Sequence, residues 1–447
     1  MPGKTKGIPY GISDFEKIRV KNKYFVDKTH FIPLLEEHEY VFFIRPRRFG
    51  KSLWISILEC YYDIQLKERF DEFFKGTYIG SHPTPEKNAC LILRFDFSMI
   101  SPAPGGLEEN FEKYCARVLD HFTRVYRSFF DEEFLKKMGS PASISEKLHT
   151  LFIHAQENGL KIYAFIDEYD HFSNTILSTS GSDAYRSLTR GEGFFRHFFA
   201  VLKGAAGMRG SGLARLFIAG VSPVTMDDVT SGFNIGMNIS VQPAFNEMAG
   251  LSEKEARDML NYYKEKNLFV FDVDESLEIM REWYDGYLFS DMASSTVLNT
   301  DMVLYFIHFS IVNQAIPRRL IDDNVKIDYG KLKRLMFINR RLNGNFDILK
   351  SIMEKGEIQA PVNPSFPIDQ LLTPANFISL LYFFGLLIFK GTRHGTSLLA
   401  IPNMTISHLM YGYIRYAYRD SELFRINVWK FGDRVREKNK IGTGRQY

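Results

Sequence analysis

The chain has 447 residues, which is long enough for two or three domains. Hydrophobic residues make up 45% and charged residues 24%, a balance that is typical of globular proteins and excludes a fibrous or disordered chain. The net charge of +3 is too small to indicate nucleic-acid binding by itself.

Cysteine usage and hydropathy restrict the compartment. Cys60, Cys90 and Cys115 have no CxxC spacing, which disfavours a zinc knuckle or a disulfide scaffold and fits a reducing compartment. The first residues, MPGKTKGIPYGIS, lack the apolar core of a signal peptide. The longest near-apolar run, 377–389, is shorter than the roughly 20 residues that span a bilayer, so we expect a buried helix there. We therefore expect a cytoplasmic protein with no membrane partner.

Apolar runs alternate with helical patterns through the first half of the chain. The expected strands cover residues 40–44, 90–98, 162–166 and 213–224, and the expected helices cover residues 52–64, 107–130, 143–159 and 193–207. Strands that alternate with helices predict an α/β fold in which a central parallel sheet carries helices on both faces.

After about residue 245 the pattern becomes mostly helical. Ser252 and Glu255 have the spacing of a capping box, and Pro374 falls early in the first turn of another expected helix. Residues 386–403 predict one hairpin, and the stretch after residue 425 is rich in Lys and Arg. We therefore expect a mostly helical second domain that ends in a basic tail.

The stretch RPRRFGKS, residues 45–52, lies between an expected strand and an expected helix. Its second half matches the phosphate-binding pattern G-x-x-x-x-G-K-[ST]. Gly50 would let the backbone approach a phosphate, Lys51 would reach the β- and γ-phosphates, and the Ser52 hydroxyl would coordinate Mg²⁺. The free amides and the dipole of the following helix would favour an anion at the same place. The alternative is a basic turn that only caps the helix.

The first half of this stretch departs from the general pattern. Arg45 stands where the first glycine is expected, and Pro46 removes one amide donor. Further arginines add positive charge beside the expected pocket. The expected nucleotide-binding residues are Arg47, Arg48, Phe49, Gly50, Lys51, Ser52 and Leu53.

An acidic pair follows the expected third strand. Asp167 and Glu168 come directly after the apolar run 162–166, at the end of the strand where ligands lie in an open parallel sheet. We expect Asp167 to hold Mg²⁺ together with Ser52, and Glu168 to orient and activate an attacking water. If the strand continues, the two carboxylates point to opposite sides. The alternative is a solvated turn at the end of a strand.

The fourth expected strand ends in a polar residue that could sense the γ-phosphate. Ser222 is the candidate catalytic residue for that role and Thr225 the second choice, while the alternative is a plain turn before Pro223. The charge that develops during phosphoryl transfer also predicts an arginine finger. The candidates for the finger are Arg190, Arg196 and Arg215, and another subunit could supply it instead.

Several motifs in order resemble the bacterial predicted AAA-ATPase-like family. IPYGISDFEKIRVKNKYFVDKTHFI, VFFIRPRRFGKSL, IDEYD and IAGVSPVTMDDVTSGFNIGMNIS resemble its ATPase part, and WYDGYLF, LLYFFGLL and IPN resemble its helical region. The resemblance covers about residues 8 to 405. It implies that the Arg45 form of the loop is normal in this family, and that the acidic strand is not the sequence neighbour of the loop strand. It also places ATP and Mg²⁺ on Gly50, Lys51, Ser52, Asp167 and Glu168.

The resemblance also predicts how the chain is divided. The expected fold is an α/β P-loop NTPase with a central parallel sheet, followed by a mostly helical carboxy-terminal domain. The expected domains are a P-loop ATPase-like domain over 1–245, a helical or winged-helix-like lid domain over 246–420, and a basic tail or truncated remnant over 421–447. The segment YFVDKT, residues 24–29, either lines the base pocket or forms a turn at Asp27, and the turn is the favoured interpretation.

Members of this family typically carry a carboxy-terminal nuclease of the PD-(D/E)XK type. Such a nuclease needs a metal-binding Asp and an acidic-x-Lys on an adjacent strand. After Asn403 this chain has no acidic-x-Lys behind a strand, and REK at 436–438 has the wrong spacing. We expect no nuclease activity, and a truncated family member or a stand-alone ATPase module.

Three functions remain open at this stage. The first is Mg²⁺-dependent ATP hydrolysis, which the presence of Glu168 favours. The second is a nucleotide-binding regulatory scaffold with little turnover. The third is a nucleic-acid-associated module that binds through the basic tail and residues 45–48. A homo-oligomer and a protein client of unknown identity are further candidate partners, and ATP is not distinguished from GTP.

Overall fold

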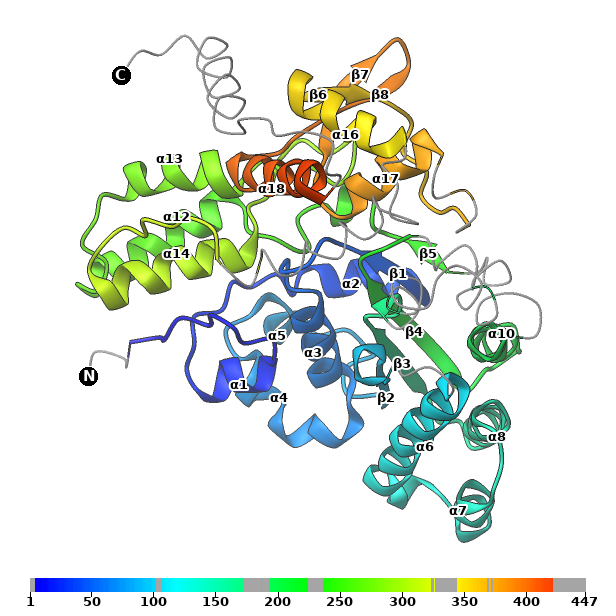
Figure 1. Cartoon of the computed structure of the whole chain (residues 1–447). Helices are drawn as coiled ribbons and strands as arrows, with labels where there is room; N and C mark the ends of the chain where they lie inside the picture. The colour runs from blue at the N-terminus through cyan, green and yellow to red at the C-terminus, as the bar shows by residue number, and fades with distance from the viewer. Residues whose placement is uncertain are drawn as a thin grey trace, which may run out of the picture.

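A parallel sheet of five strands organises the amino-terminal half of the protein (Figure 1). The structure is a computed structural model that describes residues 5–101, 106–171, 175, 186, 193–223, 236–322, 325, 344–367, 370 and 373–420. The strands are β1 Tyr40–Ile44, β2 Leu91–Asp96, β3 Ile162–Asp167, β4 Leu213–Gly220 and β5 Met237–Asn238. They lie in the order β2-β3-β4-β1-β5, and each neighbouring pair is parallel. The expected central parallel sheet is confirmed.

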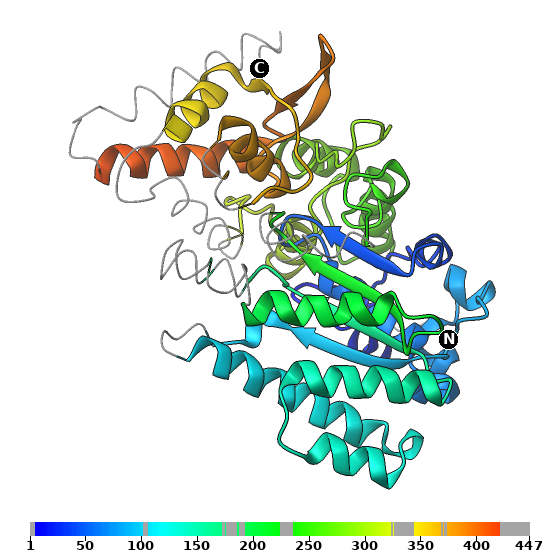
Figure 2. The same cartoon turned by 90° about the vertical axis from the view of Figure 1, so that its right-hand side faces the viewer.

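Helices cover both faces of this sheet. Helix α3, Lys51–Tyr62, lies on the face where Glu59 meets Arg94 of β2. On the other face, the ring of Phe97 packs against Phe111 and Phe198. That face is covered by α6 Leu107–Val125, α8 Ile144–Glu157 and α10 Phe194–Ala206 (Figure 2). The remaining elements of this half are α1 Phe15–Val20, α2 Phe31–Glu36, α4 Phe70–Phe74, α5 Tyr78–Ser81, α7 Glu132–Gly139 and short 3₁₀ turns at Ile64–Arg69, Phe97–Met99, Arg127–Phe129 and Pro243–Phe245.

The register of the sheet brings three strand ends to one edge. Strand β4 pairs with β1 as far as Ile44↔Gly220 and with β3 as far as Ile166↔Ile218. Strand β2 lies between the loop strand β1 and the acid-bearing strand β3 in the sequence, as the family resemblance implies, and β4 separates β1 from β3 in the sheet. Because these strands are parallel, the segments that follow all three leave from the same edge, which is where ligands bind in such sheets.

The carboxy-terminal half is mostly helical, as expected. Its helices are α12 Glu253–Glu265, α13 Val273–Tyr284, α14 Thr300–Asn313, α16 Gly344–Lys355, α17 Pro374–Phe383 and α18 Met404–Asp420. The strands β6 Glu357–Gln359, β7 Ile388–Arg393 and β8 Thr396–Ala400 form a small antiparallel sheet in the order β6-β8-β7.

Local sequence signals fix several features of this half. Ser252 and Glu255 form both hydrogen bonds of a capping box at the start of α12. Pro374 is the first residue of α17. The expected hairpin is β7–β8, and its two-residue turn consists of His394 and Gly395, which both have positive φ. These three predictions are confirmed.

The apolar run 377–389 is a helix only in part. Helix α17 ends at Phe383 and β7 begins at Ile388, so the expectation of one buried helix is wrong for the second half of the run. The reason is Gly385, whose φ of +73° is the left-handed conformation that ends helices. Among the described residues, no helix is both long enough and apolar enough to cross a membrane.

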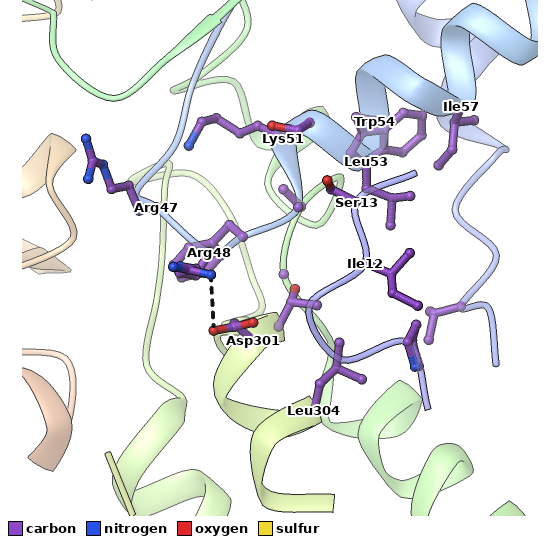
Figure 3. Close-up of a pocket in the computed structure, with 18 of the residues that line it drawn as sticks. Ile12, Ser13, Arg47, Arg48, Lys51, Leu53, Trp54, Ile57, Asp301 and Leu304 are labelled. Atoms are coloured by element: carbon purple, nitrogen blue, oxygen red, sulfur yellow. Dashed lines mark ion pairs between the residues drawn. The ribbon is translucent and has the colours of Figure 1, made fainter. Parts of the chain in front are cut away.

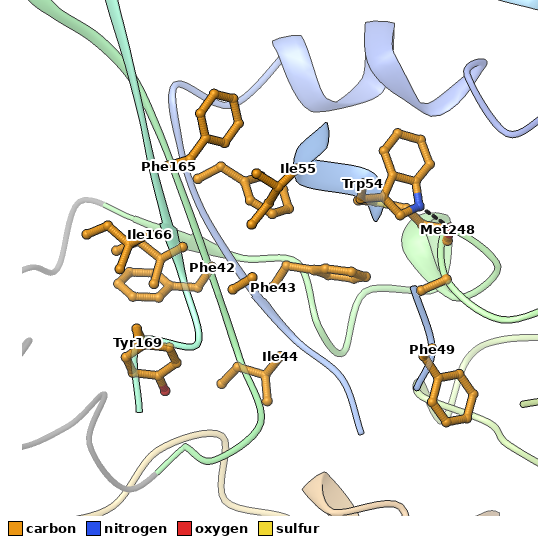
Figure 4. Packing of buried hydrophobic residues seen from close by; sticks show 14 of the residues in the cluster. Phe42, Phe43, Ile44, Phe49, Trp54, Ile55, Phe165, Ile166, Tyr169 and Met248 are labelled. Atoms are coloured by element: carbon orange, nitrogen blue, oxygen red, sulfur yellow. Dashed lines mark hydrogen bonds between the residues drawn. The ribbon is translucent and has the colours of Figure 1, made fainter. Parts of the chain in front are cut away.

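One continuous hydrophobic core joins the sheet to the carboxy-terminal helices. In Figure 4, Phe43 of β1 and Ile55 of α3 lie between the strands and the segment around Met248. The indole nitrogen of Trp54 donates a hydrogen bond to the Met248 carbonyl oxygen, which links α3 to the second half of the chain. The three cysteines are buried free thiols.

The end of β4 has no room for a side chain at Gly220. A Cβ atom there would lie 2.3 Å from the ring of Tyr169 and 2.6 Å from Oδ1 of Asp170, and both of these residues are buried. We expect Gly220→Ala to lower the free energy of unfolding by about 1–3 kcal/mol, because the buried neighbours must move. Urea denaturation measures the change.

Gly204 of α10 provides the matched control, because a Cβ added there meets no atom within 4 Å. Gly204→Ala is expected to leave the unfolding free energy unchanged or to raise it by up to about 1 kcal/mol, since alanine has a higher helix propensity than glycine. Equal stability of the two variants would contradict the close packing at Gly220.

Candidate functional site

A cavity of about 520 Å³ opens at the carboxyl edge of the sheet. This volume is in the range of small-molecule sites. One side is polar and is lined by Arg47, Arg48, Gly50, Lys51, Ser52, Asp96, Asp167, Glu168 and His171. The other side is largely apolar and is lined by Ile12, Ile18, Tyr24, Phe25, Leu53, Trp54, Ile57, Met259 and Leu304. Figure 3 shows Arg47 and Lys51 on one side of the cavity and Ile12, Trp54 and Ile57 on the other.

The loop after β1 presents a buried amine to the polar side. Gly50, with φ of +93°, is the residue before α3, and this left-handed conformation suits glycine. The Lys51 side chain that follows is only 5% exposed, and its Nζ donates hydrogen bonds to the carbonyl oxygens of Arg45 at 3.0 Å and Pro46 at 3.1 Å. Burial lowers the pKa of Lys51, and the carboxylates of Glu168, Asp167 and Asp170 oppose this effect.

Arg45 leaves the loop on the side opposite to Lys51. Its side chain is 1% exposed and is not part of the cavity wall formed by the described residues. The guanidinium donates hydrogen bonds to the carbonyl oxygens of Ile44, Ser240 and Phe245. A bulky residue is therefore compatible with the loop, because its side chain points away from the ligand side. It also offers no surface to a nucleic acid.

The acid at the end of β3 lies against the start of α3. Ser52 and Asp167 both line the cavity, and the Glu168 amide donates a hydrogen bond to Asp167 Oδ1 at 3.0 Å. Arg94 of β2 donates to Asp167 Oδ2 at 3.2 Å. The Asp167 side chain is 2% exposed, and this burial raises its pKa; Glu168 acts in the same direction and Arg94 opposes it. The expected meeting of the loop and the acidic strand end is therefore present.

Glu168 turns away from the strand instead of continuing it. Strand β3 ends at Asp167, and Glu168 has a φ of +49°, which is uncommon for a residue with a side chain. The following turn is closed by a hydrogen bond from the His171 amide to the Glu168 carbonyl at 2.9 Å. The strand does not continue through Glu168, so the condition under which the two carboxylates would point to opposite sides is not met. Both residues line the cavity.

Ser222 is held by the neighbouring strand end. Its side chain is 1% exposed, its amide donates to Asp170 Oδ2 at 2.8 Å, and its carbonyl accepts from the Tyr169 hydroxyl. The Val221 amide donates to the other Asp170 oxygen at 3.1 Å, so Asp170 joins the ends of β3 and β4. Burial raises the pKa of Asp170 to about 6, and Glu168 adds to the effect. Ser222 does not belong to the cavity wall formed by the described residues, and its sensing role stays a prediction.

The other candidates of this kind have different outcomes. Thr225 and Arg190 lie outside the described residues. Arg215 donates hydrogen bonds to the carbonyl oxygens of Glu36 and His38 at the other edge of the sheet, so its guanidinium does not reach the cavity of its own chain. Arg196 lies in the first turn of α10.

Two further residues of β2 belong to the site, although the sequence did not single them out. Arg94 bridges Asp167 and Glu59 of α3, which it contacts at 2.9 Å. Asp96 ends β2, pairs in register with Asp167 and lines the cavity. An acid at the end of an apolar strand is the same signal that identified Asp167, so Asp96 could have been found.

The amino-terminal segment contributes to the apolar side of the cavity. Tyr24, Phe25 and Lys28 line it, as a base pocket would require. Asp27 instead forms the favoured turn, because its Oδ1 accepts hydrogen bonds from the amide and hydroxyl of Thr29. The two interpretations of residues 24–29 thus describe different side chains of one segment.

The carboxy-terminal half completes the cavity. Asp301 at the start of α14 forms an ion pair with Arg48 at 3.9 Å, marked by the dashed line in Figure 3. The Asp301 amide also donates to the Arg48 carbonyl at 3.3 Å. The phosphate-loop candidate therefore contacts both halves of the chain.

The donor set at the polar side fits a magnesium ion. Mg²⁺ prefers oxygen ligands and usually binds through one or two carboxylates together with phosphates and waters. The Ser52 hydroxyl and the Asp167 carboxylate supply such oxygens, and both residues line the cavity. No group of three or more His, Cys, Asp or Glu side chains is arranged to hold a metal in the part of the chain that the structure describes.

Arg94 compensates a buried charge, which leads to a stability prediction. Arg94→Met leaves the Asp167 carboxylate without its cation, and we expect the free energy of unfolding to fall by about 1–3 kcal/mol. This expected loss is kept small because the Arg94 side chain is 33% exposed, so that water screens part of its charge. Arg257→Met, which breaks an exposed ion pair with Asp274, is the control and should cost less than about 1 kcal/mol. Urea denaturation that finds no loss for Arg94→Met would contradict this role.

Comparisons with known proteins relate this geometry to other chains. A curated relative, described as an uncharacterized protein in the vnfD 5' region of Azotobacter chroococcum mcd 1, is 25% identical over 293 residues. The match covers 63% of this chain and 48% of the relative, so the chain spans about half the length of that protein.

A solved structure, described as the Aeropyrum pernix Orc1 protein in complex with DNA, aligns with 90% of this chain and 95% of that chain. The sequence identity is 9% and the TM-score is 0.31, a likeness too distant to indicate a function.

The match to a protein family is more direct. Residues 9–230 match the sequence model of the family described as predicted AAA-ATPase. The matched segment contains the loop at 45–52 and the acidic pair that meets it. Through residues 9–230, this chain belongs to the predicted AAA-ATPase family.

Proposed function

We propose that this protein binds ATP with Mg²⁺ and hydrolyses it at the cavity described above. The observation that carries the proposal is the meeting of two sequence-distant parts in one cavity. Lys51 and Ser52 come from the loop after β1, and Asp167 and Glu168 come from the end of β3. An amine, a hydroxyl and two carboxylates in this arrangement fit a magnesium triphosphate.

The polar side of the cavity suits the phosphates. Lys51 is the first residue of α3, so the free amides and the positive end of that helix dipole face the same place as its amine. Arg47 and Arg48 line the cavity nearby and add donors for phosphate oxygens. A bound triphosphate would replace the loop carbonyls as partners of the Lys51 amine.

The apolar side suits a nucleobase. Tyr24, Phe25, Trp54 and Leu304 line it, and aromatic and aliphatic side chains are what planar bases pack against in binding sites. These residues come from the amino-terminal segment, α3 and α14, so the base would lie between the two halves of the chain. Membership of an ATPase family supports ATP as the nucleotide.

The acids would divide the remaining work. Mg²⁺, when bound, would neutralise charge on the phosphates, and Ser52 and Asp167 would hold it. Glu168 would accept a hydrogen bond from the attacking water and orient it, and a carboxylate that lines the cavity is able to take its proton. Arg94 would keep Asp167 in place through Oδ2.

Removal of the loop amine tests the phosphate site. We expect Lys51→Ala to weaken ATP binding by on the order of 1.5–3 kcal/mol, because a charged contact to phosphate is lost. This corresponds to roughly 10- to 150-fold in Kd, which isothermal titration calorimetry can measure. Lys161→Ala is the matched control, since the Lys161 amine pairs with Glu86 just before β3, at the far edge of the sheet. An unchanged Kd for Lys51→Ala would count against the proposed phosphate site.

Replacement of the general-base candidate separates hydrolysis from binding alone. Glu168→Gln keeps the size of the side chain and removes its basicity, so we expect kcat to fall by about 10²- to 10⁴-fold. The Kd for ATP should stay within about threefold, since no phosphate donor is removed. Phosphate release is the measurement, and Glu157→Gln at the exposed end of α8 is the control. If wild type and Glu168→Gln turn over equally slowly, the protein is instead a nucleotide-binding scaffold.

A further inference from the structure

We propose that Arg45 is a positioning residue of the phosphate loop, which it holds from the rear by tying it to the segment after β5 and to Phe289 of the carboxy-terminal half. We define the rear as the side of residues 45–49 that faces away from the cavity. The inference rests on the proposed function, because it assigns the loop a ligand. It goes beyond that function by giving a role to the residue that replaces the first glycine of the general pattern.

The guanidinium joins three separate segments at the rear. It donates hydrogen bonds to Ile44 of its own strand, to Ser240, and to Phe245 at 3.0 Å. Its flat face lies over the ring of Phe289, with the guanidinium carbon 4.2 Å from the ring centroid. One side chain therefore connects the start of the loop to residues 240–245 and to Phe289, both beyond β4.

The contacts suit a buried cation that has no carboxylate partner. No ion pair links Arg45 to an acid in the part of the chain that the structure describes, so carbonyl dipoles and aromatic rings compensate the charge. Burial lowers the pKa of Arg45 to about 9, which still leaves it charged at neutral pH. A guanidinium can bond several carbonyls at once because its donors point in fixed, divergent directions.

The rest of the loop packs on residues of the carboxy-terminal half of the chain. Pro46 packs closely against Gly385. A Cβ atom added to Gly385 would lie 2.7 Å from the proline ring. Phe49 also lines the cavity, and its ring contacts those of Tyr287 and Phe289 with centroids 4.8 and 5.4 Å away. The Phe49 carbonyl accepts a hydrogen bond from the Gly250 amide at 3.2 Å. Arg45 is the first of these rear contacts along the chain.

Arg45 also bears directly on the cavity side, through its own backbone. The Lys51 amine donates to the carbonyl oxygens of Arg45 and Pro46. The side chain of Arg45 thus anchors the residue whose backbone carbonyl accepts a hydrogen bond from the Lys51 amine on the cavity side. If the side chain is removed, that carbonyl and the adjacent loop lose their anchor while the lysine remains.

This arrangement predicts an unusual result for a substitution that restores the general pattern. Arg45→Gly converts RPRRFGKS into a complete G-x-x-x-x-G-K-[ST] sequence. We expect it to raise the Kd for Mg-ATP by about tenfold or more, because small displacements of a binding loop have large effects. Arg45→Lys, which keeps the charge but not the fork of donors, should fall between wild type and Arg45→Gly.

Arg215→Ala is the matched control for a merely structural effect. Arg215 also donates two hydrogen bonds to backbone carbonyls, at 3.2 and 3.1 Å, but at the other edge of the sheet. Urea denaturation should show a loss of stability for both arginine variants. Calorimetry with Mg-ATP should show a raised Kd only for the Arg45 variants, and steady-state kinetics should show KM raised more than kcat is lowered.

The outcomes separate this inference from the proposed function. If wild type does not bind Mg-ATP, the proposed function fails and the inference fails with it. If wild type binds and folded Arg45→Gly binds equally well, only the inference is overturned. Should Arg45→Gly not fold, Arg45→Lys and Phe289→Leu decide the matter, since both weaken the rear contact with smaller changes. A Kd equal to that of wild type in both of these variants overturns the inference.

Discussion

Two buried charges of opposite sign lie at one edge of the sheet, and the site depends on how the fold accommodates both. The Lys51 amine donates to carbonyls of its own loop, while Asp167 accepts hydrogen bonds from Arg94 and the Glu168 amide. A buried ion without such partners costs several kcal/mol. The order β3-β4-β1 places both groups on one cavity, and the partners that stabilise each charge also hold it ready for a ligand of mixed charge.

The loop between these charges belongs to both halves of the molecule. Its cavity side carries Lys51, and its rear is occupied by Arg45, Pro46 and Phe49, which contact the segment after β5 and the carboxy-terminal half. The ion pair between Arg48 and Asp301 adds a contact at the rim of the cavity. A ligand that changes the loop would therefore act on packing and hydrogen bonds in the second half. In a well-packed interior such contacts cannot change independently of one another.

Much of this could be predicted from local patterns. The strand 40–44, the capping box at Ser252 and the hairpin turn all depend on residues that are neighbours in the chain, and each is present as expected. The missed parts depend on contacts between distant elements. Arg94 looked like an ordinary polar residue of an alternating strand, and the turn at Glu168 depends on packing against β4, because the Tyr169 amide donates to the Ala219 carbonyl.

The sequence by itself determined the parallel sheet, the glycine that precedes α3, and the polar residues that follow β1 and β3, because these reflect backbone preferences and hydrophobic periodicity. Only the tertiary structure decided where Arg45 points. Arginine is usually exposed, and here it is buried because carbonyl oxygens 195 and 200 residues further along the chain accept hydrogen bonds from its guanidinium. A charge is buried only where such acceptors converge, and their convergence is a property of the folded chain alone.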